Sequence, residues 1–231
     1  MIIKENRTLD FIDLGTAKFA ETWDLQKSLL ASRVENRITD TLLFVEHPNV
    51  YTIGKAGSNS NIIADTEFIS QNEIEIFEID RGGDVTFHGP GQIIGYPIIN
   101  LANWEKDIHK YLRAIEEAII NVCKEYDINA TRNPEYTGVW VGENKICAIG
   151  VKVSRWVTMH GFAFNVNTNL NLFNGIIPCG IKDKGVTSLE KEIGRKINID
   201  VVKKSVLNNF AKVFGYDKIN VREKEDLLVE I

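Results

Sequence analysis

Few cysteines and no long hydrophobic run occur in this sequence, and both shortages narrow the class of protein. Cys123, Cys147 and Cys179 are spaced 24 and 32 residues apart, which matches neither a disulfide framework nor a common zinc pattern. No stretch approaches the roughly 18 apolar residues of a membrane span, and the first residues are typical of neither a signal nor a transit peptide. We therefore expect a cytoplasmic protein in a reducing compartment, with no membrane partner.

Nucleotide and metal motifs are also missing. The chain has no GxxxxGK[ST] or GxGxxG loop, and its four histidines form neither an HxH nor an HExxH pattern. We expect no nucleotide cofactor and no metal. The 32 acidic residues outnumber the 27 basic ones, giving a net charge of -5, so the field of the whole molecule disfavours nucleic acid as a partner.

The composition is that of a globular protein. Of 231 residues, 44% are hydrophobic and 26% charged, and no linker-like cluster or repeat divides the chain. We expect one domain over 1–231; the sequence does not decide whether the tail after about residue 215 is peripheral. Residues 1–80 carry 7 basic and 14 acidic side chains, whereas residues 141–200 carry 8 and 5. The second region suits an acidic partner or anionic substrate, although a random mixture of surface charges is an equally simple interpretation.

Hydrophobic periodicity predicts strands mixed with three long helices. Strands are predicted at 9–14, 41–46, 50–54, 73–80 and 92–101, with three more between 138 and 167. Helices are predicted at 16–34, at 105–126 and from an N-cap at Asp200 to Phe214. The buried stripe of the first helix is expected to comprise Phe19, Trp23, Gln26, Leu30 and Val34. This pattern favours an α+β (mixed α/β) fold, a largely antiparallel sheet packed with helices.

The segment RGGDVTFHGPGQ (residues 81–92) is the densest group of unusual residues. Its four glycines permit positive φ and close approach of a ligand to the backbone. Arg81 adds a fixed hydrogen-bond donor and His88 a titratable group. Such a segment is typical of a loop wrapped around a substrate and equally of a tight hairpin with bulges, and its spacing leaves both open.

Cys179 lies between Pro178 and Gly180, a setting that can expose a thiol on a sharp turn. Lys182 and Lys184 make its surroundings electropositive, as a low thiol pKa requires. A buried loop cysteine is the alternative, and the usual burial of free cysteines favours it.

The other thiols and titratable side chains have simpler interpretations. Cys123 and Cys147 are expected in the core. Lys145, two residues before Cys147, shares its sheet face if the strand is regular, and solvent exposure is its default interpretation. Among the histidines, we expect a hydrogen-bonded core residue, a turn residue and an exposed residue at His160, His47 and His109, respectively.

Taken together, the motifs resemble those of the lipoyl(octanoyl) transferase family. The similarity runs through LLFVEHPNVYTIG, RGGDVTFHGPGQIIGYPIINL, GVWVGENKICAIG, HGFAFNVNTNL, PCGI and VTSL, which span most of the chain. In that family an RGGxxTxHGPGQ block, a lysine on a KI(C)xxG strand and a PCG cysteine occur in this order. The resemblance implies the fold of the biotin and lipoate protein ligases.

This resemblance assigns roles that the residues alone leave open. It implies that Cys179 is the acyl-thioester nucleophile and Lys145 the essential lysine. Three stretches are implied to bind the acyl substrate: Arg81, Gly82, Gly83, Asp84, Val85, Thr86, Phe87 and His88; Ala148, Ile149 and Gly150; and Gly161, Phe162 and Ala163. Small residues suit an apolar groove for a C8 chain. Phe162 and Phe164 stand where the family commonly has smaller aliphatic residues, which leaves the preferred chain length open.

The implied activity is transfer of an octanoyl group from octanoyl-acyl carrier protein to a specific lysine of lipoyl domains, through a Cys179 thioester. The implied acceptors are the lipoyl domains of 2-oxoacid dehydrogenase E2 subunits and the glycine cleavage H protein. Lys145 is expected to favour the thiolate, to protonate the leaving thiol and then to accept a proton from the incoming amine. No cofactor is expected, because the thioester already carries the activation.

Two alternatives remain open at this point. An ATP-dependent lipoate or biotin protein ligase shares the fold and uses a lysine, but it forms an acyl-adenylate and needs no cysteine, so the PCG motif favours the transferase. A non-catalytic acyl-binding or carrier-docking module would bind octanoyl carrier protein without transferring the acyl group.

Overall fold

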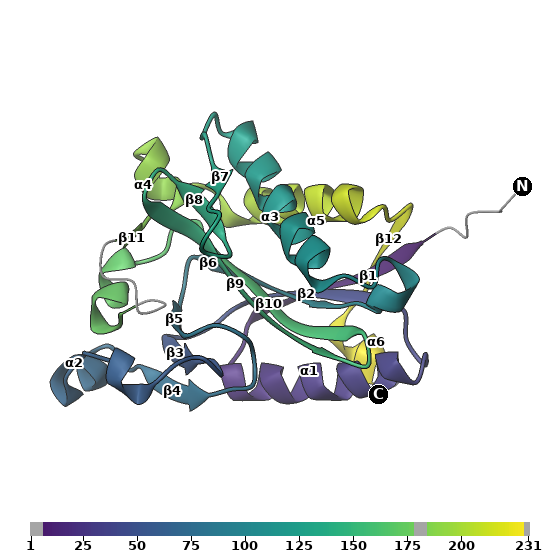
Figure 1. The fold of residues 1–231 in the computed structure, drawn as a ribbon, viewed down its shortest axis with the longest axis horizontal. Helices are drawn as coiled ribbons and strands as arrows, with labels where there is room; N and C mark the ends of the chain where they lie inside the picture. Colours follow the sequence, from purple (N-terminus) through teal and green to yellow (C-terminus); the bar gives the residue numbers. More distant parts are fainter. Residues whose placement is uncertain (1–6, 178–183, 229–231) are drawn as a thin grey trace, which may run out of the picture.

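The computed structural model describes residues 7–177 and 184–228, which form two β-sheets packed with helices (Figure 1). The helices are α1 (Phe19–Val34), α2 (Thr66–Gln71), α3 (Ile108–Glu125), α4 (Leu189–Ile193), α5 (Ile199–Phe214) and α6 (Lys224–Leu228). The strands are β1 (Thr8–Thr16), β2 (Asp40–Glu46), β3 (Val50–Ile53), β4 (Glu75–Glu78), β5 (Val85–His88), β6 (Gln92–Ile98), β7 (Thr131–Arg132), β8 (Val139–Val141), β9 (Asn144–Ser154), β10 (Val157–Asn165), β11 (Gly185–Val186) and β12 (Lys218–Val221).

Most neighbouring strands are antiparallel. Among the described residues, nine strands form one sheet in the order β12-β1-β2-β6-β10-β9-β8-β7, with β11 paired to β9. β1 lies parallel to β2 and β12, and β11 lies parallel to β9, whereas every pair from β2 through β7 is antiparallel. A second sheet has the order β4-β3-β5. The predicted α+β class with a largely antiparallel sheet is confirmed.

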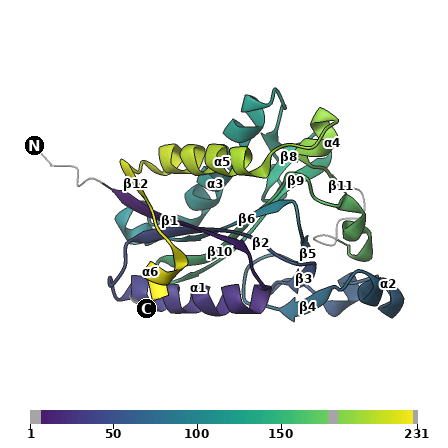
Figure 2. The same ribbon diagram turned by 180° about the vertical axis from the view of Figure 1, so that it is seen from behind.

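Helices cover both faces of the large sheet. α3 and α5 lie on one face and α1 on the other, as Figures 1 and 2 show from opposite sides. The apolar side chains between the sheet and α3 and α5 form the largest core, and a second core lies beneath α1. β6 is buried along its whole length because it lies between these two layers, as its continuous apolar run predicts.

The buried face of α1 differs from the predicted stripe. The residues that face inward are Phe19, Thr22, Gln26, Leu29, Ser32 and Arg33. Trp23 is only partly buried at the border of the core. The Arg33 Nε donates to Asp40 Oδ1 at 2.9 Å, and the Gln26 Oε1 accepts from the His160 backbone N–H at 2.8 Å. Leu30 and Val34 of the predicted stripe are partly buried against the core beneath α1. The predicted side of α1 therefore packs on the sheet together with the buried positions beside it, and polar partners on the sheet hold Gln26 and Arg33.

Other details of the elements also differ from the sequence predictions. α5 begins two residues early, because the side chain of Asn198, not that of Asp200, caps it and accepts the Asp200 backbone N–H at 2.9 Å. The strand predicted at 73–80 is the short edge strand β4, on which Ile76 is 43% exposed. The tail after residue 215 supplies β12, an edge strand hydrogen-bonded to β1.

Candidate active site

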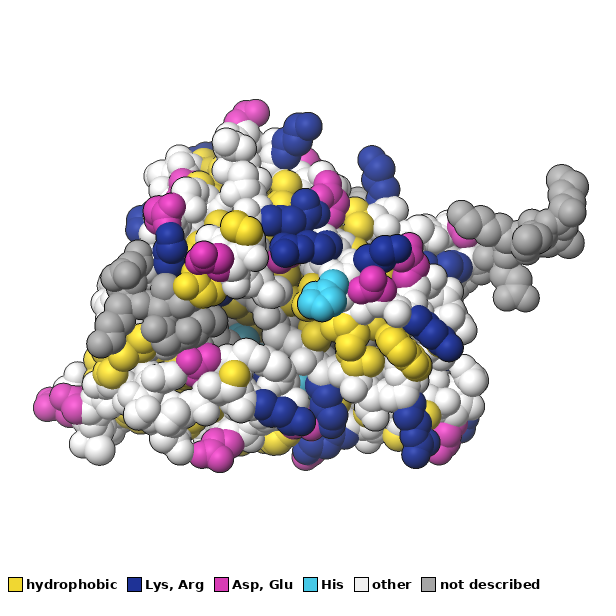
Figure 3. Space-filling model, in the orientation of Figure 1, with side chains coloured by type: hydrophobic (Ala, Val, Ile, Leu, Met, Phe, Trp, Pro, Cys, Tyr) yellow, Lys and Arg dark blue, Asp and Glu magenta, His cyan; other side chains and the backbone are white. Residues whose placement is uncertain are grey.

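A cavity of about 310 Å³ lies between the small sheet and strands β9 and β10 of the large one. On one side are the loop 79–84 and β5; on the other are β9, β10 and the start of β11. In the space-filling view, the surface is hollowed between the part of the molecule that holds β3 and β4 and the part that holds β9 (Figure 3). Lys145 and every predicted substrate-binding residue except Phe87 line this cavity.

Phe87 lies outside the cavity. It is 1% exposed and packs edge-on against Phe173 and Tyr51 in the core of the small sheet. Successive residues of a strand point to opposite faces, so Thr86 and His88 face the cavity while Phe87 between them faces away. The segment predicted as one loop thus contains a regular strand, which fixes these alternating directions.

Arg81 is a buried side chain that ties the loop 79–84 to β3. Its Nη2 donates to the Thr52 carbonyl oxygen at 2.7 Å and to Thr52 Oγ1 at 2.9 Å, and its Nη1 donates to the Gly82 carbonyl oxygen at 3.0 Å. A Cβ at Gly54 would lie 2.7 Å from Nη1 and 2.3 Å from the Gly83 carbonyl oxygen. Only glycine at position 54 therefore leaves room for this arrangement.

Asp80 fastens the same loop to the large sheet. Its carboxylate accepts from Lys152 Nζ on β9 at 2.5 Å and from His160 Nε2 on β10 at 2.9 Å, and the Gly82 N–H donates to the Val151 carbonyl oxygen at 2.8 Å. Burial raises the pKa of Asp80, but the hydrogen bonds from Lys152 and His160 outweigh it and lower the pKa to about 2. Burial lowers the pKa of His160 to about 4, against the opposing effect of Asp80. Near neutral pH, an ionised carboxylate thus accepts from a neutral imidazole and an ammonium.

Two glycines of the predicted acyl-binding stretches are required by the protein's own packing. A Cβ at Gly150 would lie 2.9 Å from both Arg81 Cδ and the Gly82 carbonyl oxygen. A Cβ at Gly161 would lie 2.1 Å from the Gly95 carbonyl oxygen. From the sequence, both glycines were expected to let a ligand approach the backbone closely. In the structure, Gly150 leaves room for the loop 79–84 and Gly161 leaves room for the backbone of β6.

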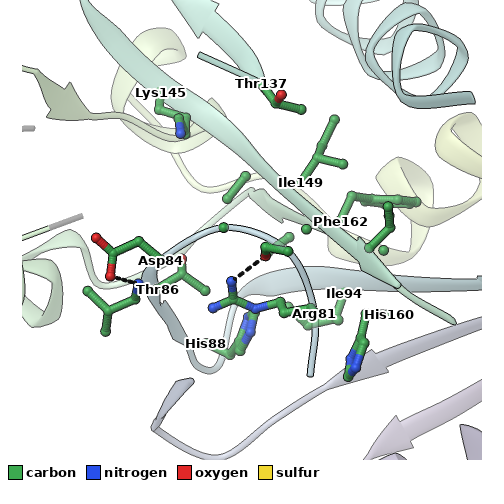
Figure 4. A pocket seen from close by; sticks show the side chains of 18 of the residues that line it. Arg81, Asp84, Thr86, His88, Ile94, Thr137, Lys145, Ile149, His160 and Phe162 are labelled. Carbon is green, nitrogen blue, oxygen red and sulfur yellow. Dashed lines mark hydrogen bonds between the residues drawn. The ribbon is translucent and has the colours of Figure 1, made fainter. Parts of the chain in front are cut away.

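Apolar side chains form the middle of the cavity. Ile149, Phe162 and Ala163 line it from β9 and β10, with Ile94 from β6 (Figure 4). The Phe162 ring covers Gly95, where a Cβ would lie 2.1 Å from its Cζ, and it packs edge-on to Phe44 at 6.3 Å between ring centroids. The aromatic ring is thus fixed by its neighbours and sets the width of the cavity at this point.

Lys145 lies at the other end of the cavity from Arg81 and His160 (Figure 4). Its Nζ lies 4.8 Å from the centre of the Trp140 ring, a cation–π distance. Its backbone pairs with Trp140 on β8 and with Val186 on β11. A half-buried lysine that lines a cavity contradicts its default interpretation as a solvated side chain. The role implied by the resemblance stays a prediction.

A bulge separates Lys145 from Cys147. The pairing of β8 with β9 shifts register between these two residues, so the regular strand assumed from the sequence is interrupted. Lys145 lines the cavity, whereas Cys147 and Cys123 are fully buried in the core beneath α3 and α5, as predicted. Burial raises the pKa of Cys123 to about 12 and that of Cys147 well above its usual value. Neither thiol is therefore poised to react.

Cys179 lies outside the described residues, together with Pro178, Gly180 and Lys182. The described residues on either side contact the site region. The Ile177 N–H donates to the Asn61 carbonyl oxygen at 2.8 Å, and the Thr187 N–H donates to the Lys145 carbonyl oxygen at 3.0 Å. Lys184, Gly185 and Val186 line the cavity, and Lys184 forms an ion pair with Glu143.

Several polar residues of the cavity were not predicted as site residues. Gln92 and Asn165 line it as buried side chains. His160 is the hydrogen-bonded buried residue that the sequence predicts, and it lines the cavity as well. His47, interpreted as a turn residue, is buried and contacts the Ala17 carbonyl oxygen at 2.7 Å and the Tyr96 hydroxyl at 2.8 Å. The position of Gln92 at the end of the glycine-rich motif could have indicated a site residue. The residue spacing does not indicate its hydrogen-bond partners, His88 and Asn165.

The described residues hold neither a metal-binding cluster nor a membrane-spanning helix. In the described part of the chain, no group of three or more His, Cys, Asp or Glu side chains is arranged to hold a metal ion. Over the same residues, no helix has the length and apolar character needed to span a membrane. His109 is exposed, as predicted.

Comparison with known proteins assigns the family. The model of the lipoyl protein ligase A/B catalytic domain matches residues 18–211. A curated relative named octanoyltransferase, from Caldicellulosiruptor bescii, is 50% identical over 93% of this chain and 94% of its own length. This match covers the motifs that carry the resemblance described above.

Solved structures share the fold at low sequence identity. The lipoate protein ligase of the archaeal lipoylation system of Thermoplasma acidophilum has a TM-score of 0.70 at 18% identity, over 97% of this chain and 91% of that one. The biotin protein ligase of Aquifex aeolicus has a TM-score of 0.50 at 15% identity, over 90% of this chain and 69% of that one. Both confirm the predicted ligase-like fold. The chain therefore belongs to the lipoyl protein ligase A/B catalytic-domain family and, within it, to the octanoyltransferases.

Proposed function

We propose that this protein transfers an octanoyl group from octanoyl-acyl carrier protein to a lysine of lipoyl domains, through a thioester on Cys179. The acceptors are the lipoyl domains of 2-oxoacid dehydrogenase E2 subunits and the glycine cleavage H protein. The family supports the acyl-transfer activity and the lipoyl-domain class of acceptor. The carrier-protein donor, the particular acceptors and the cysteine intermediate are parts of the proposal.

The observation that carries the proposal is a largely apolar cavity with a lysine at one end. A volume of about 310 Å³ lies at the lower limit of ligand pockets, roughly 300 to 1,000 Å³. Ile94, Ile149 and Phe162 supply apolar walls, and Lys145 lines the same space. Such a cavity suits a medium-length acyl chain whose carbonyl end lies near the lysine.

In the first half-reaction, the Cys179 thiolate attacks the octanoyl carbonyl of the donor thioester. A new sulfur–carbon bond forms, the bond to the phosphopantetheine sulfur breaks, and the ammonium of Lys145 gives a proton to the departing thiolate. The thiolate is the reactive form of cysteine, and a nearby ammonium favours it. Residues 184–187, which follow the PCG segment in the sequence, pair with β9 beside Lys145.

In the second half-reaction, the amine of the acceptor lysine attacks the Cys179 thioester. An amide bond forms, the sulfur–carbon bond breaks, and Cys179 leaves as a thiolate while the neutral Lys145 accepts the proton lost by the amine. The enzyme returns to its starting protonation state. No nucleotide is consumed, because a thioester is already activated for acyl transfer.

Intact-mass spectrometry tests the proposal directly. The full-length protein is mixed with octanoyl-acyl carrier protein without ATP, and we expect an octanoyl adduct that Cys179→Ala abolishes and Cys147→Ala preserves. Addition of a lipoyl domain should discharge the adduct and octanoylate one lysine. An adduct that forms only with ATP would indicate a ligase. Saturable binding of the carrier without any transfer would indicate a binding module.

A further inference from the structure

A chain of buried hydrogen bonds joins the Arg81 end of the cavity to the backbone of Lys145. Its side chains belong to the loop 79–84 and to β3, β5, β6 and β10, and all of them are buried. The members in order are Arg81, Thr52, His88, Gln92, Asn165, Thr187 and Lys145. The successive donor–acceptor distances are 2.9, 3.3, 3.1, 2.8, 2.9 and 3.0 Å.

Backbone carbonyl groups fix the direction of the two amides. A carbonyl oxygen only accepts. The Gln92 Nε2 faces the Phe87 carbonyl oxygen at 3.3 Å, so Oε1 faces His88. The Asn165 Nδ2 faces the Thr187 carbonyl oxygen, so Oδ1 is left to accept from Gln92 Nε2. Neither amide can be reversed without opposing two acceptors.

The partners of His88 fix its tautomer. Because Gln92 Oε1 only accepts, His88 Nδ1 carries the proton. Burial and the nearby positive charge of Arg81 lower the pKa of His88 well below its usual value, so His88 is neutral and Nε2 accepts from the Thr52 hydroxyl. The Thr52 oxygen in turn accepts from Arg81. Every donor therefore points the same way, from the guanidinium of Arg81 toward Lys145.

This series of hydrogen bonds ends where β11 pairs with β9. The Thr187 carbonyl accepts from Asn165, while the Thr187 N–H donates to the Lys145 carbonyl oxygen. Gly185 and Val186, which line the cavity, pair there with Asn144 and Lys145. Loss of either amide would leave buried donors and acceptors without partners. It would also weaken the contact between residues 184–187 and the Lys145 segment of β9.

We infer that Gln92 and Asn165 are positioning residues of the transfer reaction, which hold residues 184–187 against the Lys145 segment of β9. This inference rests on the proposed function. The two side chains are cross-strand neighbours on β6 and β10, so they form the single connection between the His88 part and the Thr187 part of the chain described above. Hydrogen bonds in a network strengthen one another. Removing either Gln92 or Asn165 is therefore expected to separate His88 from Thr187.

The test compares Gln92→Leu, Asn165→Leu and the double variant. Each single substitution leaves the other amide without its cross-strand partner. The double substitution removes both amides and is expected to regain part of the lost stability. We expect kcat for octanoyl transfer to fall roughly 10- to 100-fold in all three, with KM nearly unchanged, because misplacement of reacting groups lowers kcat. A merely structural role predicts that kcat recovers with stability in the double variant, and that result would overturn the inference.

Asn167→Leu is the matched control. Asn167 lies two residues from Asn165 and also makes two side-chain hydrogen bonds, at 2.7 and 3.0 Å, but both join Ile197. It should lose stability and keep kcat. A fall in kcat equal to that of Asn165→Leu would count against a specific positioning role.

Hydrogen exchange at the Thr187 amide provides a readout that needs no substrate. We expect this amide to exchange at least tenfold faster in Gln92→Leu and Asn165→Leu than in the unchanged protein and in Asn167→Leu. Unchanged exchange would overturn the inference even if transfer were slow. If the unchanged protein transfers no octanoyl group, the proposed function fails, but the exchange experiment still decides whether the two amides hold residues 184–187.

Discussion

The two ends of the cavity are held in different ways. At the Arg81 end, Arg81 is fixed by buried hydrogen bonds to Thr52, and Asp80 by partly buried ones from Lys152 and His160. At the Lys145 end, the ammonium lies over the Trp140 ring and its strand is held by backbone pairing. The Arg81 end is thus held through side-chain hydrogen bonds, and the Lys145 segment through the backbone pairing of its strand. The difference fits a site in which one end shapes the space and the other moves protons.

The largest effect is expected at the Lys145 end. Lys145→Met removes the proposed proton donor and acceptor, and general acid–base groups contribute roughly 10²- to 10⁴-fold to rates. We expect kcat for transfer to fall within that range, measured by octanoylation of a lipoyl domain. Lys184→Met is the matched control, because Lys184 lines the same cavity but pairs with Glu143. Equal losses in both variants would contradict a special role for Lys145.

The Arg81 end should respond to pH through His160. Its pKa is about 4 in the folded protein and 6.5 in the unfolded chain, so the unfolded chain takes up the proton first as pH falls. The free energy of unfolding should therefore drop by about 3 kcal/mol between pH 6.5 and 4 on account of this group. Denaturant titrations at several pH values measure the drop, and His160→Asn, which tolerates the local φ of 56°, should reduce it.

His109→Asn is the control for the pH experiment, since His109 is exposed on α3. The same slope in His160→Asn and in the unchanged protein would show that His160 is not held neutral. Asp80 contributes at lower pH only: its pKa of about 2 lies below the ordinary 3.8, so its stabilisation is lost as pH falls from 3.8 to 2.

A smaller effect is expected from crowding the loop 79–84. Gly150→Ala places a methyl group 2.9 Å from Arg81 Cδ and the Gly82 carbonyl oxygen, and overpacking costs roughly 1 to 3 kcal/mol. At Gly82 the nearest atom to an added Cβ is 3.4 Å away, so Gly82→Ala should stay within about 0.5 kcal/mol. Thermal unfolding of the two variants separates them, and equal melting temperatures would contradict the close packing of Arg81 on β9.

Much of the fold follows from the sequence because its signals are local. β6 and the β8–β9–β10 meander were predicted from runs of apolar residues, and each needs only its own neighbours to be recognised. Several of the most deeply buried positions of α1 were not predicted, because partners on the sheet, far away in the sequence, hold the helix. The cap of α5 was placed wrongly although it is local, because Asn198 and Asp200 are both favourable capping residues. His160, 134 residues from Gln26, donates a hydrogen bond from its backbone N–H to Gln26 Oε1 on α1.

For the site, the sequence predicted which segments line the cavity but not the directions and contacts of individual side chains. The roles of Lys145 and the glycine-rich loop came from resemblance to a family, since neither periodicity nor charge distinguishes a site lysine from a solvated one. The direction of Phe87 required knowledge that β5 is a strand. The partners of Gln92 and Asn165 are 73 and 22 residues away, respectively, and no spacing in one sequence reveals such contacts.

The smallest effect is expected between the two ends, at the aromatic wall. Phe162 lines the cavity and covers Gly95, so Phe162→Leu opens space beside the acyl chain. A methylene in an apolar pocket changes kcat/KM by roughly tenfold or more, and we expect the ratio of decanoyl to octanoyl transfer to rise by about that factor. Phe164→Leu is the control, because Phe164 is equally buried in the same core but does not line the cavity.

Competition between octanoyl and decanoyl carrier proteins measures this ratio in a single reaction. Both variants should lose comparable stability, since each loses part of a buried ring, so a change in chain-length preference confined to Phe162→Leu isolates the cavity wall from the core. An unchanged ratio would mean that chain length is set at the Arg81 end, where the loop 79–84 is tied to both sheets. The comparison of the two ends would then assign selectivity to the hydrogen-bonded end and leave the aromatic wall a packing role alone.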